Sequence, residues 1–519
     1  MQGKKTYQEK LFLTFQLSEH IPVDNIYRRL NELIDFSFLY KSTASYYGLE
    51  GQKSIDPVVF MKLMLAGYLE NLVSDRRIIN ALRLRLDIRY FIGYDLDEEL
   101  PWHSTLSRTR QLYGEEVFTE LFKSILKQCI QKGMVSGKRQ AVDSVFIKAN
   151  ASIESMLEKE IMDDLSVYKQ ELASNEEVTG TKKDSEEKQV DKCSQHSKFT
   201  NSTHYSPVDP DSRLSTKPGK VSNLNYLGQV SVDTASHVIT HVQAFHADKR
   251  DSQCLPAILV RVADTLRENN LALEEIIADT NYSSGNSLKA LSAMDLTGYI
   301  PNTGRFIYEK KGFTYHPQGD FYECRNGKSL TFKGFSENDK RYMIARKNCI
   351  YCPFKDTCIG NKKYMVVKST KDKPYYDQMH LRMQTKKAAR MMKKRQSTVE
   401  PVIGTLVNYL GIKKVSSRGI SQANKCLTMA AVAYNLKKLL KYKPKLDDSL
   451  QRMVKIVADS GNKVLKRFSL IISRQINHVV NKFHIKLNRC HLTLTWGHEY
   501  QLCNTHFSQR LTKEFKFLF

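Results

Sequence analysis

Three carboxylates stand at positions where a chemical site would need them. Asp143 lies inside the apolar run AVDSVFI, Asp279 ends the apolar run IIADT, and Glu400 lies in RQSTVEPVIGTL, within one of the most basic stretches of the chain. An unpaired aspartate is costly to bury in an apolar strand, and ligands bind where the strands of an α/β sheet end. Taken singly, each acid is also compatible with a helix cap or a salt-bridge partner.

The order of these acids along the chain, strand, strand and helix, favours a shared metal site. Converging carboxylates repel one another, and a divalent cation with a preference for oxygen ligands relieves that repulsion. Two Mg²⁺ ions about 3.5–4 Å apart can activate a water or a 3′-hydroxyl and stabilise the leaving oxygen of a phosphodiester. The hypothesis is therefore a catalytic triad of Asp143, Asp279 and Glu400 that binds Mg²⁺ or Mn²⁺.

The charge balance points to a polyanionic partner. Eighty Lys and Arg against 55 Asp and Glu give a net charge of +25 and a pI near 9.4. Such a field attracts nucleic acid or an anionic membrane, and the clustering of the positive residues favours nucleic acid over a general solubility charge. No apolar run of about 18 residues predicts a membrane span, and the N-terminus lacks the features of a signal peptide. We expect a cytoplasmic, nucleoid-associated protein.

Helical periodicity dominates the first part of the chain. The segment DPVVFMKLMLAGYLENL has Asp56 as its expected N-cap, SDRRIINALRLRLDIRYFIG has Ser74 or Asp75, and PWHSTLSRTRQLYG has Ser104. Short basic helices joined by tight turns are typical of a helix-turn-helix DNA reader, with Arg108 and Arg110 as contacts. Ordinary helical bundles also contain basic amphipathic helices, so both interpretations stay open.

From residue 138 the pattern changes to alternating strands and helices. The expected order is strand, long insert, strand, strand, helix, strand, helix, strand, which predicts an α/β fold with a mixed sheet. An aromatic, Lys-rich segment with cysteines follows, and then a long helical region from about residue 378 to 441 that carries Glu400.

The set of motifs resembles the DDE transposases of bacterial insertion sequences, in the branch with a cysteine-bearing insertion before the catalytic glutamate. The resemblance covers roughly residues 20 to 440. It rests on the order of the motifs DPVVFMKLMLAGYL, HSTLSR, AVDSVFIKANAS, DPDSRLSTKPGK, NYLGQVSVD, ADTNYSSGNSL, STVEPVIGTL and AAVAYNLKKLL.

This resemblance implies a ribonuclease-H-like catalytic core in a multi-domain protein. The implied domains are an all-α DNA-binding domain at 1–137, the first part of the core at 138–302 with a flexible insert at about 151–205, the cysteine-bearing insertion at 303–375, the helical completion of the core at 376–445, and a basic C-terminal extension at 446–519.

The resemblance also implies a reaction and its partners. Asp143, Asp279 and Glu400 would be the metal-binding triad of an enzyme that nicks the terminal inverted repeats of an element and joins the freed 3′-hydroxyls to target DNA. Synapsis of two ends implies at least a homodimer. Many relatives carry Tyr, Arg and Lys at positions seven before, four before and seven after the glutamate, where this chain has Lys393, Gln396 and Val407.

Two groups of basic residues are predicted to meet DNA phosphates besides the helical pair. One lies in the loop DPDSRLSTKPGK, whose alternative interpretation is a Pro/Gly turn capped by Asp, and where Asp209 and Asp211 could add metal or neighbouring ligands. The other surrounds Glu400. Together they are Arg213, Lys217, Lys220, Lys393, Lys394, Arg395, Lys413, Lys414 and Arg418.

Four cysteines, Cys324, Cys349, Cys352 and Cys358, have the spacing C-x24-C-x2-C-x5-C. A Cys-x2-Cys pair with two flanking thiols can close a tetrahedral Zn²⁺ site; four reduced thiols, or a vestigial site, are the alternative. The other six cysteines are scattered and are expected to be buried thiols: Cys129, Cys193, Cys254, Cys426, Cys490 and Cys503.

Two rival functions remain at this level. One is a catalytically silent DNA-binding regulator derived from a transposase, and the other is a ribonuclease-H-like nuclease without transposition. The transposase is the leading hypothesis: the three acids argue against the regulator, although the off-pattern neighbours of Glu400 and the C-terminal tail keep it as an alternative.

Overall fold

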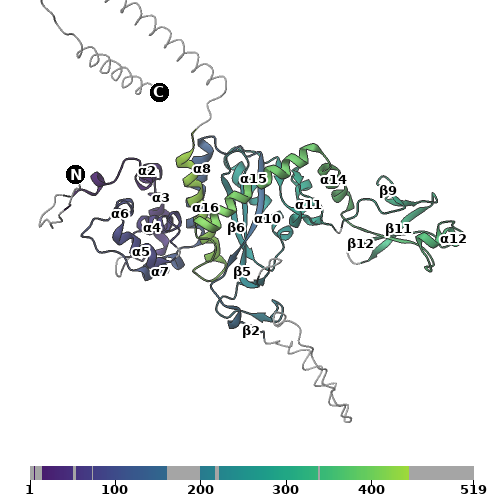
Figure 1. The fold of residues 1–519 in the computed structure, drawn as a ribbon, viewed down its shortest axis with the longest axis horizontal. Helices are drawn as coiled ribbons and strands as arrows, with labels where there is room; N and C mark the ends of the chain where they lie inside the picture. Colours follow the sequence, from purple (N-terminus) through teal and green to yellow (C-terminus); the bar gives the residue numbers. More distant parts are fainter. Residues whose placement is uncertain are drawn as a thin grey trace, which may run out of the picture. The chain divides into compact units, whose positions relative to one another are not determined.

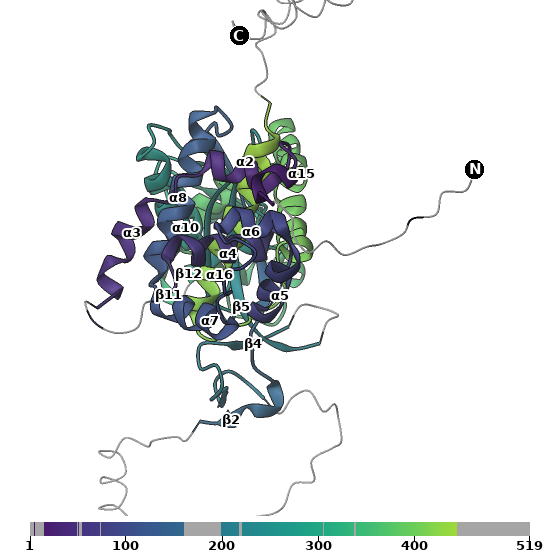
Figure 2. The same cartoon turned by 90° about the vertical axis from the view of Figure 1, so that its left-hand side faces the viewer.

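The N-terminal region is built of short helices. The computed structural model describes residues 5, 15–48, 50, 54–72, 74–159, 199–216, 221–304, 306–336 and 339–443. Within them the region contains α1 (Leu17–His20), α2 (Ile26–Leu33), α3 (Phe38–Thr43), α4 (Pro57–Leu69), α5 (Asp75–Leu84), α6 (Leu86–Ile92), α7 (His103–Leu112) and α8 (Glu115–Gln131). Figure 2 shows several of these helices facing the viewer. The expected helical N-terminal region is confirmed.

Local capping explains where some of these helices begin. The side chain of Asp56 accepts hydrogen bonds from the backbone N–H groups of Val58 and Val59 at 2.7 and 3.2 Å, and Pro57 takes the first helical position. Ser74 caps α5 as expected. The predicted cap at Ser104 is wrong, because α7 starts at His103 and no side chain caps it.

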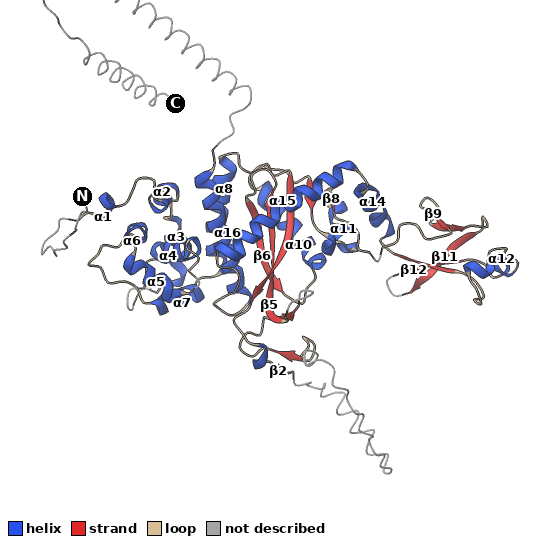
Figure 3. Ribbon diagram, viewed as in Figure 1, coloured by secondary structure: helices blue, strands red, loops and turns tan. Residues whose placement is uncertain are grey.

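The central sheet has six strands and mixed direction (Figure 3). The order is β4-β5-β1-β7-β8, and β6 also pairs with β5. The first three long strands form an antiparallel meander, whereas β7 and β8 run parallel to β1. Their bounds are β1 (Arg139–Lys148), β4 (Arg213–Ser215), β5 (Asn223–Asp233), β6 (Ile239–His246), β7 (Glu275–Ile277) and β8 (Thr297–Tyr299). The predicted α/β region is thus confirmed.

Long helices pack on this sheet. The contacting helices are α10 (Asp251–Arg267), α11 (Gly285–Ala293), α15 (Lys386–Tyr409) and α16 (Ile420–Lys441), and Figure 1 shows α15 and α16 beside the strands. On α16, Asn435 and Asn424 accept hydrogen bonds from the backbone N–H groups of Ile239 and Ala244, at 2.9 and 2.7 Å. These bonds satisfy polar groups of β6 that the sheet leaves unpaired.

One hydrophobic core joins the N-terminal helices to the sheet. Phe60 of α4, Phe118 of α8, Val230 of β5 and Ala430 of α16 are all buried members of it, and α16 packs against both α4 and α8. The N-terminal helices are therefore built onto the core that carries the three acids. No helix among the described residues has the length and apolar character needed to cross a bilayer.

A second sheet lies in the segment expected only as a cysteine-bearing insertion. Five antiparallel strands follow the order β13-β12-β11-β10-β9 around a small core that includes Tyr322, Leu330 and Tyr342. The elements are β9 (Phe313–His316), β10 (Phe321–Cys324), β11 (Ser329–Ser336), β12 (Asp339–Met343), α12 (Lys347–Ile350), α13 (Lys355–Cys358) and β13 (Val366–Thr370). Helix α14 (Lys373–Met383) then leads into α15.

Candidate active site

Strand pairing brings Asp143 and Asp279 to matching positions on two neighbouring parallel strands of the central sheet. Strands β1 and β7 are parallel, with Ala141 opposite Ile277. Asp143 and Asp279 each follow this pair by two residues. Asp279 lies just after the carboxyl end of β7, where ligands bind in α/β sheets, and Asp143 lies within β1.

The two aspartates are held and tuned differently. Asp143 accepts a hydrogen bond from the backbone N–H of Ser144 at 2.8 Å, and Asp279 accepts one from the backbone N–H of Asn281 at 2.9 Å. Burial raises the pKa of Asp143 above its ordinary value, and the neighbouring Arg395 opposes that rise. Burial also raises the pKa of Asp279, and the charge of Asp143 raises it further. The two carboxylates therefore share one electrostatic environment.

Arg395 connects Asp143 to Glu400. Its Nη1 lies 2.8 Å from Oδ2 of Asp143, and its Nη2 lies 3.5 Å from Oε1 of Glu400. The Arg395 side chain is 11% exposed, whereas that of Glu400 is 55% exposed. Predicted as a DNA contact, Arg395 is instead buried between two of the three acids.

The carboxylates of Asp143, Asp279 and Glu400 are chemically suitable ligands for a divalent cation, but they are not arranged to hold one. Carboxylate oxygens are the ligands that Mg²⁺ and Mn²⁺ prefer. Across the described part of the chain, however, no three His, Cys, Asp or Glu side chains are placed so that they could hold a metal ion. The guanidinium of Arg395 supplies positive charge beside Asp143 and Glu400 instead.

A fourth carboxylate, Asp251, belongs to the same environment and was missed in the sequence. Its charge raises the pKa of both Asp143 and Asp279. Asp251 begins α10, and its Oδ1 accepts a hydrogen bond of 2.7 Å from the side chain of Gln229. An acid in the first turn of a helix is ordinarily explained by the helix dipole, so no local signal marked it.

Most of the basic residues predicted to contact DNA near Glu400 lie at the surface. Lys393, Lys413, Lys414 and Arg418 are exposed, and Lys394 is half-buried. Residues 413–415 extend the sheet beyond β1: the N–H of Lys148 donates to the carbonyl of Lys413 at 3.2 Å, and the N–H of Val415 donates to the carbonyl of Lys148 at 2.9 Å. Lys413 and Lys414 therefore lie at the end of the strand that carries Asp143.

The two arginines predicted on the N-terminal helices have different surroundings. Arg108 is exposed on α7. Arg110 is only 5% exposed and forms an ion pair with Asp75 of α5. This placement is a correction to the expected DNA contact at Arg110, because the guanidinium is enclosed between helices.

The described part of the loop before β5 has a structural role. Asp209 is buried, and its Oδ1 accepts hydrogen bonds from the hydroxyl of Tyr226 at 2.5 Å and the N–H of Gly419 at 3.1 Å. Asp211 accepts one from the N–H of Ile420 at 2.9 Å. Both acids thus hold the start of α16 and do not join the triad. Arg213 is half-buried beside Asp248; Lys217 and Lys220 lie outside the described residues.

The four spaced cysteines lie near one another in the second sheet. Burial raises the pKa of Cys358, and the charges of Cys349, Cys324 and Cys352 raise it further. Among the described residues, these thiols included, no three potential ligands are placed so that they could hold a metal ion. The predicted zinc site therefore has no support. Cys129, Cys254 and Cys426 are buried free thiols, as expected, and Cys193, Cys490 and Cys503 lie outside the described residues.

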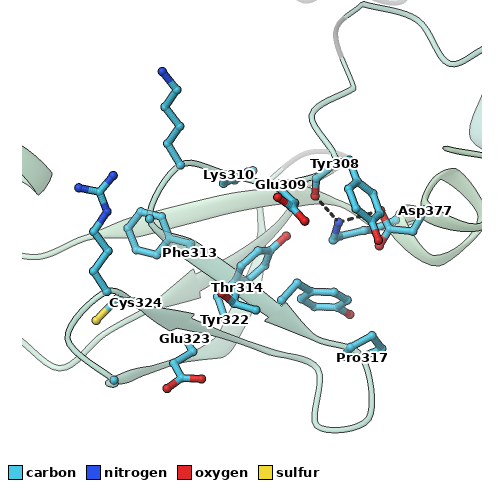
Figure 4. A pocket seen from close by; sticks show the side chains of 16 residues that line it. Tyr308, Glu309, Lys310, Phe313, Thr314, Pro317, Tyr322, Glu323, Cys324 and Asp377 are labelled. Carbon is cyan, nitrogen blue, oxygen red and sulfur yellow. Dashed lines mark hydrogen bonds and ion pairs between the residues drawn. The ribbon is translucent and has the colours of Figure 1, made fainter. Parts of the chain in front are cut away.

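A cavity of about 840 Å³ lies on the second sheet and is separate from the three acids (Figure 4). Its floor is aromatic, with Tyr308, Tyr315 and Tyr322, and Lys373 donates hydrogen bonds to the carbonyl of Tyr308 and to Asp377, at 3.2 and 2.8 Å. Lys373 is 5% exposed and lies over the rings of Tyr308 and Tyr315. These contacts attach α14 to the sheet.

Comparisons with known proteins give a consistent result. A family model described as a transposase domain (DUF772) matches residues 15–112, and a model described as a transposase DDE domain matches residues 323–440. The second match includes Glu400. No curated protein is significantly similar to the chain.

Solved structures of transposases also match, but weakly. The piggyBac transposase synaptic complex with hairpin DNA is 11% identical over 81% of both chains, with a TM-score of 0.25. The Mos1 transposase paired-end complex with the left transposon end is 7% identical over 49% of this chain and 60% of that one, with a TM-score of 0.15. The Mos1 mariner paired-end complex with Mn is 7% identical over 54% of this chain and 68% of that one, also with a TM-score of 0.15. TM-scores this low do not establish a shared fold.

Proposed function

The chain belongs to the DDE transposases of insertion sequences, as the two transposase family matches show, and from this we propose that it cuts and joins DNA at the ends of its element. It binds the terminal inverted repeats, hydrolyses a phosphodiester at each end, and joins the freed 3′-hydroxyls to target DNA. Two ends must be held together, so at least two copies of the chain act in one complex. The proposed place of action is the cytoplasm, at the nucleoid.

The observation that carries this proposal is the contact of Arg395 with both Asp143 and Glu400, beside the neighbouring strand that leads to Asp279. Asp143 and Asp279 each come two residues after Ala141 and Ile277, which are paired between β1 and β7. Glu400 is connected to Asp143 through Arg395. The mixed sheet, an antiparallel meander followed by parallel strands, supports a ribonuclease-H-like core.

The acids would serve as ligands and the basic residues as phosphate contacts. A bound divalent ion would lower the pKa of the attacking water or hydroxyl and stabilise the leaving oxygen. Asp143, Asp279 and Glu400 would hold such ions with carboxylate oxygens, while exposed Lys413 and Lys414 draw the DNA backbone to the end of β1.

Two displacements make up the reaction. In the first, water attacks phosphorus, the bond from phosphorus to the 3′-oxygen breaks, and a 3′-hydroxyl and a 5′-phosphate remain. In the second, that 3′-hydroxyl attacks a target phosphodiester, and the displaced target oxygen leaves as a hydroxyl. The first step consumes one phosphodiester by hydrolysis, the second exchanges one phosphodiester for another, and neither forms a covalent link to protein.

The test uses the full-length chain and a plasmid that carries the genomic flanks of its gene. With Mg²⁺ or Mn²⁺ we expect nicked ends and then joined products. Asp143→Asn, Asp279→Asn and Glu400→Gln should each reduce cutting by more than about 100-fold, since even outer-shell changes cost about 10–100-fold, with DNA affinity retained.

A matched control is Glu268→Gln. Glu268 directly follows α10 and is 56% exposed, close to the 55% of Glu400, but it pairs with Lys123 far from the triad. This variant should cut normally. Binding without cutting would select the silent regulator, cutting without joined products would select the nuclease, and unchanged cutting in all three acid variants would place the site elsewhere.

A further inference from the structure

The guanidinium of Arg395 neutralises nearby acids, but its hydrogen-bonding capacity is only partly used. It makes one close contact, 2.8 Å to Asp143, and one long contact, 3.5 Å to Glu400. Its Nε is buried and has no hydrogen-bond partner among the described residues. Arg–carboxylate pairs are frequently bidentate, and Arg395 makes no such pair with either acid.

Arg395 lies where a metal ion held by Asp143 and Glu400 would have to lie. The described residues contain no ready metal-holding group, although Arg395 contacts both Asp143 and Glu400 and the charge of Asp143 acts on Asp279. A single positive charge between Asp143 and Glu400 reduces their repulsion, as a divalent cation would. The guanidinium and a metal ion therefore compete for the same carboxylate oxygens.

DNA offers Arg395 another partner. Phosphate oxygens match the planar guanidinium at least as well as carboxylates do. Arg395 lies on α15 next to Lys393 and Lys394, which are exposed and half-buried respectively. A phosphate drawn to this surface would replace Asp143 and Glu400 as the anionic partner of Arg395.

We propose that Arg395 is a positioning residue that holds Asp143 and Glu400 together in the DNA-free protein and exchanges them for a DNA phosphate when a divalent metal enters. This inference rests on the proposed function, because it assumes that these acids bind metal. It makes metal binding and DNA binding cooperative. Linkage requires that each ligand raise the affinity of the other by the same factor.

The experiment measures Mn²⁺ binding to the full-length chain by the loss of the free-ion electron paramagnetic resonance signal, without DNA and with a short blunt duplex. In the absence of DNA, Arg395→Gln and Arg395→Met should bind Mn²⁺ about tenfold or more tightly than the wild type, since a one-unit change in log affinity reflects a single charge interaction. Met keeps the apolar stem, so agreement between both variants removes a packing explanation.

The coupling factor is the second readout. In the wild type, DNA should raise Mn²⁺ affinity within the usual range of about 5–150-fold, and Mn²⁺ should raise DNA affinity equally. In Arg395→Gln this factor should fall by at least about fivefold. The control is Arg390→Gln, which removes the same charge from an exposed position of the same helix; it should leave both readouts unchanged.

The outcomes separate this inference from the proposed function. If Asp143→Asn does not weaken Mn²⁺ binding, the proposed metal site itself fails. If Asp143→Asn weakens it while Arg395→Gln binds Mn²⁺ no more tightly than the wild type, or keeps the wild-type coupling, only the role of Arg395 is overturned. Thermal unfolding checks that each variant is folded, and Arg395→Lys, which keeps the charge, should bind Mn²⁺ like the wild type.

Discussion

The side chain of Gln229 donates a hydrogen bond to Asp251 across 2.7 Å and thereby fixes the start of α10 to β5. The Oε1 of the same glutamine accepts a hydrogen bond from the hydroxyl of Tyr282, which lies three residues after Asp279. Gln229 is also opposite Ser144 in the strand register, next to Asp143. These hydrogen bonds thus connect the segments that carry Asp143 and Asp279 to Asp251.

Substitutions at Asp251 should separate its charge from its hydrogen bond. Asp251→Asn keeps an acceptor for Gln229, so we expect stability near that of the wild type but weaker Mn²⁺ binding, because negative charge near Asp143 and Asp279 is lost. Asp251→Ala also leaves Gln229 unpaired and should lower the free energy of unfolding by about 1–3 kcal/mol. Chemical denaturation and Mn²⁺ titration measure the two effects.

The control for Asp251 is Asp264→Asn on the same helix. Asp264 is 43% exposed and pairs with Arg267, and 13 residues of helix place it about 20 Å along the axis from Asp251. It should change neither stability nor Mn²⁺ affinity appreciably. Equal Mn²⁺ affinity in Asp251→Asn and the wild type would show that Asp251 is only a structural residue.

The buried Asp209 should prove to be a stability residue. Asp209→Ala removes the acceptor for Tyr226 and Gly419, so we expect the free energy of unfolding to fall by about 1–3 kcal/mol. DNA affinity and cutting by the folded fraction should not change. A loss of Mn²⁺ binding at unchanged stability would instead show that Asp209 is a metal ligand.

The elements that carry the triad were predictable because their signals are local. The apolar runs around Asp143 and Asp279 and the helix around Glu400 need no knowledge of distant contacts. The second sheet was not predicted, because its strands are short and mostly half-exposed; β11 has one buried residue, Leu330. Such strands show neither an apolar run nor a clean alternation.

The pairing of Arg395 with Asp143 was beyond local reasoning. The two residues are 252 positions apart, and a basic residue on a basic helix gives no sign that it is buried. Asp251 was missed for a similar reason, since its neighbours come from β5 and from the turn after Asp279. These roles depend on tertiary contacts between segments.

Arg108 and Arg110 provide a matched test of DNA binding by the N-terminal helices. Two residues of helix separate side chains by about 200°, and so one is exposed while the other is buried with Asp75. Arg108→Ala should weaken DNA binding and reduce the salt dependence by about one charge. Arg110→Ala should lower the free energy of unfolding by about 3–5 kcal/mol, because it leaves Asp75 unpaired.

Fluorescence anisotropy at several salt concentrations and chemical denaturation separate these two results. If Arg108→Ala binds DNA with the wild-type affinity and salt slope, α7 is not part of the DNA surface. If Arg110→Ala is folded and binds DNA more weakly, Arg110 contacts DNA after all.

His241 should make the folded chain sensitive to acid. It lies on β6, and its Nε2 is buried with no hydrogen-bond partner among the described residues. Burial lowers the pKa of His241 from 6.5 to about 4. Between these two pH values the unfolded chain binds a proton that the folded chain does not, so the free energy of unfolding is fully retained above pH 6.5 and falls as the pH drops toward 4.

The slope of this fall approaches about 1.4 kcal/mol per pH unit for one proton. His241→Leu removes the titrating group and should flatten the dependence of unfolding free energy on pH in that window, as measured by denaturant titration at a series of pH values. His20→Gln, at an exposed position of α1, should leave the wild-type slope. The same slope in His241→Leu and the wild type would assign the acid sensitivity to other groups, of which the half-buried His237, whose pKa burial also lowers, is the first to test.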